Sequence, residues 1–152
     1  MSGNREVKQL QIRQDAKFFE GNVFWQLLGL KIVAGEKGKC TIELPFQEKF
    51  ENVHGNIHGG IIASLLDTSI NVTAMLYYLP PGFTTVTAQL NINYLRPAGR
   101  ERLLAKAELI HGGKKLIVGR SVAEGADNRL IAHATATLSV LDIKKGMPDE
   151  TI

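Results

Sequence analysis

The segment from Gly59 to about Tyr78 constrains the fold of this chain more than any other, because it predicts a helix that is apolar on almost every side. Its polar positions recur at spacings of four, three and four residues, which places them in one narrow stripe along the helix. The stripe consists of Gly60, Ser64, Asp67 and Asn71. Since the rest of the helix surface is apolar, we expect other parts of the chain to cover most of it.

Asp67 is the one formally charged side chain between Glu51 and Arg96. A carboxylate in such apolar surroundings is costly unless it is paired or used. An aspartate at the centre of a membrane costs about 3 kcal/mol, so we interpret the segment as the core helix of a soluble protein and expect no membrane span. The acid is therefore the first candidate for a functional residue.

Composition narrows the class of protein further. The chain has 152 residues, of which 44% are apolar, and a net charge of +3 that is spread along it. Without a basic run, we expect no nucleic-acid partner. Cys40 is the single cysteine, which excludes an internal disulfide and is typical of a reducing compartment. The first residues lack the pattern of a signal peptide, so we expect a cytoplasmic location.

Alternating apolar and polar residues predict strands on both sides of the helix. The predicted strands are 32–34, 40–46, 85–95, 102–110, 115–123 and 130–141. We expect the last four to form a meander with short turns between them. Alternation in 85–95 places one set of side chains on one face, namely Val86, Ala88, Leu90, Ile92 and Tyr94. It places a second set on the other face, namely Thr87, Gln89, Asn91 and Asn93.

One long helix among several strands predicts an α+β fold, in which a strongly bent antiparallel sheet wraps around the central helix. In the last strand Ala132, Ala134 and Ala136 are small enough to let that helix pack closely. We expect a single domain over 1–152 with its core at about 29–141, a helical segment at 5–28 and a loose tail at 144–152.

A set of motif residues surrounds the start of the helix and continues into the next strand. These residues are Asn52, His58-Gly59-Gly60, Leu66-Asp67, Asn91, Asn93, Tyr94, Arg96, Pro97 and Ala98. In this combination the chain resembles the hotdog-fold acyl-CoA thioesterases, and most closely the phenylacetic-acid-degradation type. The resemblance covers most of the chain, from about residue 29 to residue 141.

The resemblance implies a hotdog fold and the hydrolysis of acyl-coenzyme A thioesters. We expect neither a cofactor nor a metal. It implies that Asp67 acts as nucleophile or as general base for water, and that the backbone N–H of Gly59 polarises the thioester carbonyl. Asn52 and His58 would orient the site. The hydroxyl of Thr87 would help to position water or the acid, at a place where the family often has serine.

Helix geometry adds a constraint of its own on Gly59 and Asp67. The N–H of Gly59 lies at the positive end of the helix dipole, where it suits a developing oxyanion. Eight residues of helix separate it from Asp67 by ~12 Å, so the two cannot act on one carbonyl from the same chain. We therefore predict a two-fold homodimer with two shared sites, and expect a homotetramer of paired dimers.

Several alternatives remain open at this point. Asn52 is also an ordinary turn residue, His58 a structural histidine, and Thr87 a β-branched strand residue. His54 and His58 with Asp67 imitate a metal site, although Gly55 and Asn56 place the two histidines in a loop. His54 with Asp67 also loosely imitates a hotdog dehydratase or hydratase. A third possibility is a module that binds acyl-CoA without cleaving it.

The contacts to substrate are less well defined by the sequence. Our candidates for binding it are Gly60, Ser64, Arg96 and Lys114. The two cations among them would meet the phosphates of coenzyme A, or would be ordinary solvated charges. The sequence leaves open whether the acyl group is aryl or aliphatic. Residues expected to line its pocket are Leu65, Ile70, Tyr77, Tyr78 and Phe83.

Overall fold

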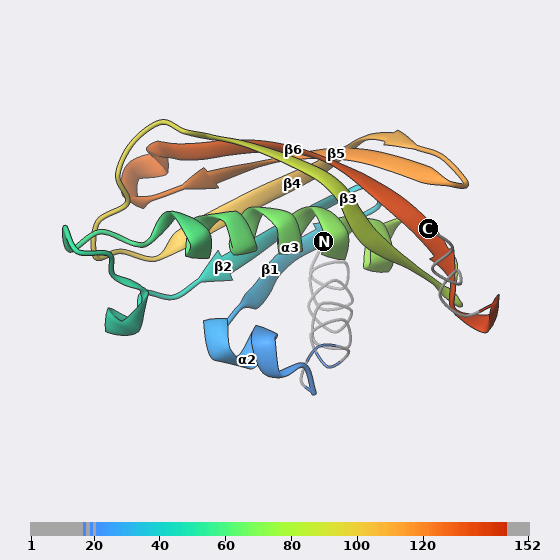
Figure 1. Ribbon diagram of the computed structural model, residues 1–152, viewed down its shortest axis with the longest axis horizontal. Helices are drawn as coiled ribbons and strands as arrows, with labels where there is room; N and C mark the ends of the chain where they lie inside the picture. The colour runs from blue at the N-terminus through green and yellow to red at the C-terminus, as the bar shows by residue number, and fades with distance from the viewer. Residues whose placement is uncertain (1–16, 18, 20, 146–152) are drawn as a thin grey trace, which may run out of the picture.

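A computed structural model describes residues 17, 19 and 21–145, and in it an antiparallel sheet of six strands curves around one long helix (Figure 1). The helices are α2 (Val23–Leu28) and α3 (Gly59–Tyr77). The strands are β1 (Lys31–Glu36), β2 (Lys39–Leu44), β3 (Phe83–Tyr94), β4 (Leu103–Gly112), β5 (Leu116–Glu124) and β6 (Leu130–Asp142). Three short 3-10 turns are η1 (Glu48–Phe50), η2 (Ala126–Asn128) and η3 (Ile143–Lys145).

The predicted α+β architecture is confirmed, because α3 lies against the concave face of the sheet. Its buried positions are Ile62, Leu65, Leu66, Ser69, Ile70, Val72, Thr73 and Ala74. The predicted polar stripe is the less buried side, with Gly60 exposed and Asp67 half-buried. By length and composition α3 would also suit a membrane, but the core helix of a soluble protein has the same properties, and here the sheet covers the apolar side.

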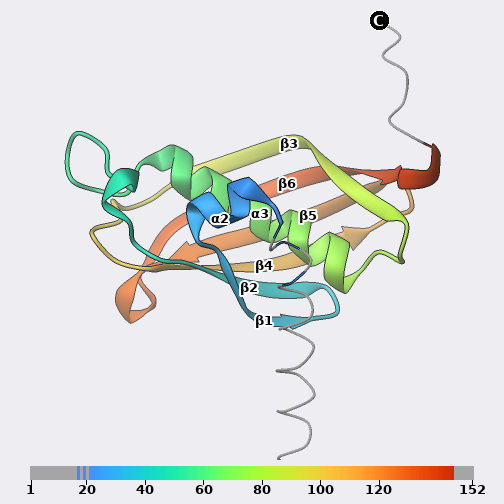
Figure 2. The same cartoon turned by 90° about the horizontal axis from the view of Figure 1, so that it is seen from below.

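The predicted meander is wrong in one respect. The strands follow the order β1-β2-β4-β5-β6-β3, so that β3 pairs with β6 at one edge of the sheet and not with β4. Figure 2 shows β1 and β3 at opposite edges, with the chain after β3 crossing to enter β4 beside β2. Alternation within a strand specifies its faces but is compatible with any neighbour, which is why the pattern could not reveal this crossing.

The predicted faces of β3 are wrong in its first half, because a β-bulge interrupts the strand. Thr87 pairs with Leu138 and Gln89 with Thr137, so Ala88 is the extra residue. One extra residue reverses every side chain on one side of the bulge. Thr85 is therefore buried beside the helix, whereas Val86 is 40% exposed.

Small residues allow the sheet to approach the helix closely. Ala132, Ala134 and Ala136 on β6 are buried, as predicted. On β5, a Cβ added to Gly119 would lie 2.5 Å from Cγ2 of Ile70, which is closer than carbon atoms pack. These short side chains hold α3 against the middle of the sheet and thereby fix the position of its polar stripe.

The segment before the sheet is only partly described. The break predicted at Gly21-Asn22 is confirmed, since Asn22 caps α2 by accepting a hydrogen bond of 2.9 Å from the N–H of Trp25. Helix α2 ends at Gly29, whose φ of 68° is a left-handed conformation that glycine adopts readily. Of the predicted helical segment 5–28, residues 5–16, 18 and 20 lie outside the described residues, and so do residues 146–152 of the predicted tail 144–152.

We expect Gly119→Ala to lower the free energy of unfolding by about 1–3 kcal/mol, because the added methyl overpacks the contact with Ile70. Urea denaturation measures this difference. Gly21→Ala is the matched control, since a Cβ there meets nothing within 4 Å, and it should change stability by less than about 0.5 kcal/mol. Equal effects of the two substitutions would contradict the close approach of α3 to β5.

Candidate active site

The start of α3 leaves one backbone donor unpaired. His58 is the N-cap, and its Nδ1 accepts a hydrogen bond of 2.9 Å from the N–H of Gly60. As the acceptor of this bond, Nδ1 carries no hydrogen. In the part of the chain that the structure describes, the N–H of Gly59 has no acceptor. This free donor lies at the positive end of the helix dipole.

The loop before α3 is organised by Asn52. Its Oδ1 accepts hydrogen bonds from the N–H of His54 at 2.9 Å and from the N–H of Asn56 at 3.2 Å. Downstream, the N–H of His58 donates to the carbonyl of Phe50 at 2.7 Å and closes the loop. Asn52 therefore has the geometry of a turn residue, and it acts on the site by shaping the loop that leads to Gly59.

A cavity of 390 Å³ opens beside the start of the helix. It is lined by Asn52, His54, Asn56, Ile57, Gly59, Ile62 and the segment Tyr94–Ala98. Tyr94 fixes one wall, because its hydroxyl donates to the carbonyl of Gly59 at 3.0 Å. Arg96 lines the same cavity and is held by a hydrogen bond of 2.9 Å from Nη1 to the carbonyl of Leu130. Tyr94 is one of the motif residues that carry the resemblance, but the sequence pattern assigned it no role of its own in the site.

Asp67 has one engaged and one unengaged carboxylate oxygen. Its Oδ1 accepts hydrogen bonds from Oγ1 of Thr87 at 2.7 Å and from Nδ2 of Asn71 at 3.2 Å. Among the described residues, no partner bonds to Oδ2. The bulge in β3 turns the Thr87 hydroxyl toward α3, so the structure places this residue beside the acid as the resemblance implied.

Asn71 and Thr85 extend this cluster and were not among the predicted site residues. Nδ2 of Asn71 also donates to Thr87 at 2.9 Å, and Oδ1 of Asn71 accepts from the hydroxyl of Thr85 at 2.7 Å. The sequence offered a signal for Asn71, which follows Asp67 by four residues in the polar stripe. It offered none for Thr85, because the bulge that turns this side chain inward is not visible in the alternation.

The helix start and the acid form two separate groups on one chain. Both belong to the same helix, α3, where eight residues separate Gly59 from Asp67 by ~12 Å. One protomer therefore presents a free N–H donor at one place and a carboxylate at another.

The match to the family model of the Thioesterase superfamily spans residues 54–132, which is more than half of the chain and includes His58, Gly59 and Asp67. The chain belongs to the thioesterase superfamily. The predicted hotdog fold is thereby confirmed, and the protein is a thioester hydrolase.

Individual relatives agree with this assignment. A 1,4-dihydroxy-2-naphthoyl-CoA hydrolase of Listeria monocytogenes is 27% identical over 120 residues, which are 79% of this chain and 97% of that protein. The crystal structure of a thioesterase family protein from Silicibacter pomeroyi matches with a TM-score of 0.80 at 27% identity, covering 87% of this chain and 98% of that one. The crystal structure of a Streptococcus mutans protein bound to acetyl-CoA matches with a TM-score of 0.68 at 28% identity, covering 74% of this chain and 89% of that one.

The remaining candidates for substrate binding in this thioesterase do not form one group. Ser64 donates its hydroxyl to the carbonyl of Gly60 at 2.8 Å, so its hydroxyl hydrogen is already committed to the helix backbone. Gly60 is exposed beside His58. Lys114 is exposed in the turn after β4, two residues beyond Gly112, which packs against Tyr78 after the end of α3, whereas Arg96 lies near the start of α3. Arg96 and Lys114 of one protomer therefore cannot bind the same phosphate group.

The residues expected to line the acyl pocket do not form one group within a protomer. Leu65 and Ile70 are 0% exposed and belong to the core between α3 and the sheet. Tyr77 packs over Gly35, and Tyr78 packs against Gly112. Helical spacing predicted an apolar surface at Leu65 and Ile70, but it could not distinguish the side of α3 that faces the sheet from the side near Asp67.

His54 does not reach the acid. Its backbone N–H bonds to Asn52 in the loop, and its side chain is exposed at the rim of the cavity. The described residues contain no group of three or more His, Cys, Asp or Glu side chains that could hold a metal ion. Among these residues of one protomer, His54 is therefore grouped neither with Asp67 nor with other side chains that could hold a metal.

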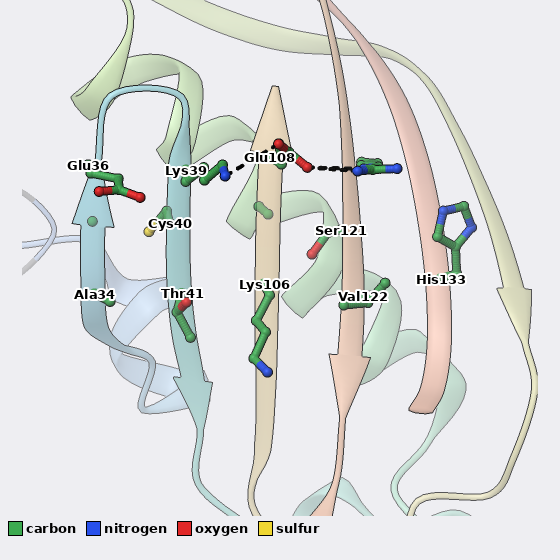
Figure 3. Close-up of a pocket in the computed structure, with 13 residues that line it drawn as sticks. Ala34, Glu36, Lys39, Cys40, Thr41, Lys106, Glu108, Ser121, Val122 and His133 are labelled. Carbon is green, nitrogen blue, oxygen red and sulfur yellow. Dashed lines mark hydrogen bonds and ion pairs between the residues drawn. The ribbon is translucent and has the colours of Figure 1, made fainter. Parts of the chain in front are cut away.

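A second hollow of 440 Å³ lies on the outer face of the sheet, where Figure 3 shows Lys39, Lys106 and Glu108 in front of the strands and α3 behind them. The guanidinium of Arg120 donates to Glu108 at 2.8 Å, and with Lys39 it lowers the pKa of that carboxyl. These charges satisfy one another on the exposed surface. The hollow is on the opposite side of the sheet from Asp67 and Gly59.

We expect His58→Ala to lower the free energy of unfolding by about 1 kcal/mol, because the N–H of Gly60 loses its capping acceptor. His58→Asn should retain most of the stability, since its Oδ1 occupies nearly the position of Nδ1 and is also a good N-cap. Thermal and urea unfolding of both variants measure the difference. If the asparagine variant is as unstable as the alanine variant, the imidazole does not cap α3.

Proposed function

We propose that this thioesterase hydrolyses acyl-coenzyme A to a free acid and coenzyme A. Two relatives support a coenzyme A thioester as substrate: one is named as a hydrolase of an aryl-CoA, and another is bound to acetyl-CoA. The observation that carries the proposal is the pairing of a free helix-start N–H at Gly59 with a carboxylate oxygen of Asp67 that has no partner among the described residues.

The two groups have complementary tasks in this reaction. The N–H of Gly59 donates to the thioester carbonyl oxygen and stabilises the negative charge that develops there. The carboxylate of Asp67 supplies the attack, either directly on the carbonyl carbon or by removing a proton from a water molecule that attacks it. The C–S bond then breaks, and the thiolate of coenzyme A leaves and is protonated. After direct attack, a water molecule must also hydrolyse the acyl–aspartyl anhydride to release the free acid and restore the carboxylate. Incorporation of oxygen-18 into Asp67 during a single turnover distinguishes direct attack from base catalysis.

The proposal requires two copies of the chain. Because Gly59 and Asp67 are ~12 Å apart along one helix, the acid must act opposite Gly59 of the partner subunit. Strand β3 offers the means of pairing, since it is 12 residues long, lies at a sheet edge and is bonded to β6 on one side only. A long uncovered edge strand is a template for pairing with another copy. A two-fold axis beside β3 makes the two α3 helices antiparallel and forms two equal sites.

Two further features belong to the same proposal. We expect two such dimers to associate as a tetramer, and we expect the protein to work in the cytoplasm, where the buried thiol of Cys40 stays reduced.

Asp67→Asn should reduce kcat by at least about 100-fold on every acyl-CoA that the wild type hydrolyses, since the amide neither attacks nor accepts a proton. Release of free coenzyme A thiol, followed over a panel of short, long and aryl acyl groups, measures the loss. Circular dichroism and size-exclusion chromatography verify that the fold and assembly persist. A folded Asp67→Asn variant with wild-type turnover would exclude the proposed role.

Proline at residue 59 tests the N–H donor directly. Pro is tolerated at the first position of a helix, and His58 has the extended conformation that proline requires of the residue before it, with φ −60° and ψ 136°. Gly59→Pro removes the N–H, whereas Gly59→Ala retains it and adds a Cβ that would lie 3.4 Å from the Tyr94 ring. We expect a loss of about 100-fold in kcat for proline and a much smaller loss for alanine.

Mixing inactive subunits tests whether the site is shared. In a heterodimer of Asp67→Asn and Gly59→Pro chains, one site carries both substitutions and the other carries neither. A statistical mixture prepared by co-expression should therefore recover about one quarter of wild-type activity, although each variant alone is inactive. A site formed within one chain predicts no recovery. The same mixture of Asp67→Asn with Asp67→Ala is the control and should stay inactive in either case.

A further inference from the structure

Four side chains between α3 and β3 form a continuous series of hydrogen bonds that ends on the acid. The hydroxyl of Thr85 donates to Oδ1 of Asn71 at 2.7 Å. Nδ2 of Asn71 donates to the hydroxyl oxygen of Thr87 at 2.9 Å, and that hydroxyl donates to Oδ1 of Asp67 at 2.7 Å. Asn71 also reaches Oδ1 of Asp67 directly, at 3.2 Å.

Asp67, the last member of the series, determines which group donates and which accepts in each hydrogen bond. The amide nitrogen of Asn71 faces the backbone carbonyl of Asp67 at 3.0 Å as well as its carboxylate, and neither oxygen has a hydrogen to donate. A rotated amide would place its own oxygen against both of them. The amide oxygen must therefore point toward Thr85, whose hydroxyl has to donate. With Asn71 donating to Thr87, the hydroxyl hydrogen of Thr87 is left for Asp67.

We propose that Thr85 and Asn71 are positioning residues for the reaction, and that they hold Asp67 with Oδ1 occupied and Oδ2 directed at the thioester. This inference rests on the hydrolytic role of Asp67 proposed above and adds two residues to it. Asn71 holds the acid through Thr87 and by its own bond, so the carboxylate is fixed at one oxygen by two donors. Thr85 acts one step further away, by fixing the orientation of the Asn71 amide.

The bulge at Ala88 is the structural cause of this arrangement. Thr85 is 9% exposed and faces α3, and Thr87 reaches the acid from the same strand. Beyond the bulge, Leu90 and Ile92 face α3 and pack against the core, and Tyr94 contacts its start through the bond to the carbonyl of Gly59. The two threonine hydroxyls of the bulged half of β3 therefore satisfy the polar side of α3 at Asp67 and Asn71.

The series also explains how a polar group as buried as Thr85 is tolerated. Its hydroxyl has a partner of good geometry at 2.7 Å, so burying it costs little. A purely structural hydroxyl of this kind would affect folding stability and leave the chemistry of the site unchanged. A positioning hydroxyl would instead reduce kcat with little change in KM, because substrate binding does not depend on how Oδ2 is aimed.

Thr85→Val is the test, because valine keeps the shape and volume of threonine and removes only the hydroxyl. We expect kcat for acyl-CoA hydrolysis to fall about tenfold, the usual worth of one well-formed hydrogen bond, with KM unchanged. Thr85→Ser should restore most of the rate, since it returns the donor. The neighbouring Thr84 gives a matched control, because its hydroxyl bonds to the sulfur of Met75 at 3.8 Å, outside the series. Thr84→Val should leave kcat near the wild-type value.

A double substitution distinguishes positioning from an independent effect. Thr85 reaches the acid through Asn71, so in an Asn71→Ala background Thr85→Val should reduce kcat no further. Independent effects would instead multiply. The inference is overturned if the losses multiply, if serine fails to restore the rate in a folded protein, or if Thr85→Val and Thr84→Val are equally active.

The outcomes also separate this inference from the proposed function. A wild type that hydrolyses acyl-CoA and depends on Asp67, with Thr85→Val fully active, overturns the positioning role and leaves the proposed function standing. A wild type that releases no thiol from any acyl-CoA overturns both. An Asp67-dependent activity with a selective, serine-rescued loss of kcat at Thr85 supports both.

Discussion

The structure depends on the burial of α3, a helix with almost no polar surface of its own. Burying its apolar side chains requires a sheet that curves around it, and the small residues of β5 and β6 let that sheet approach closely enough to do so. The polar stripe is the exception, and it runs beside the edge strand β3. The same helix therefore supplies most of the core and leaves one line of polar groups where a second molecule has access.

His58 illustrates how a helix start becomes a selective donor site. All the first N–H groups of a helix lack partners, and an anion would ordinarily meet several of them. Here the imidazole accepts a hydrogen bond from the N–H of Gly60, and the carbonyl of His58 accepts one from the N–H of Ile61 at 2.9 Å. Only Gly59 among these is left with a free donor in the described chain. Capping thus limits the site to one hydrogen-bond direction, which suits a single carbonyl oxygen.

Much of the fold followed from the sequence because it rests on patterns that the backbone geometry imposes. The period of α3, the alanine face of β6 and the break before α2 all appeared where local residue types predicted them. The place of β3 in the sheet did not, because strand order depends on long-range packing. The reversal of its first half did not either, because one extra residue at Ala88 leaves no mark in the alternation. The contact of Thr87 with Asp67 accordingly agrees with the sequence-based expectation, whereas the contact of Thr85 with Asn71 was missed.

The placement of Gly59 and Asp67 on one rigid helix has a consequence for how this chain tolerates insertions and deletions. Residues added to the loops that follow α3, β4 or β5 leave the spacing of the two groups untouched. One residue added between Gly60 and Leu66 would turn Asp67 by ~100° about the helix axis, away from the hydroxyl of Thr87. The number of residues between Gly59 and Asp67 therefore determines how the two groups are placed for the reaction. We expect related chains to vary in loop length and to keep this number constant.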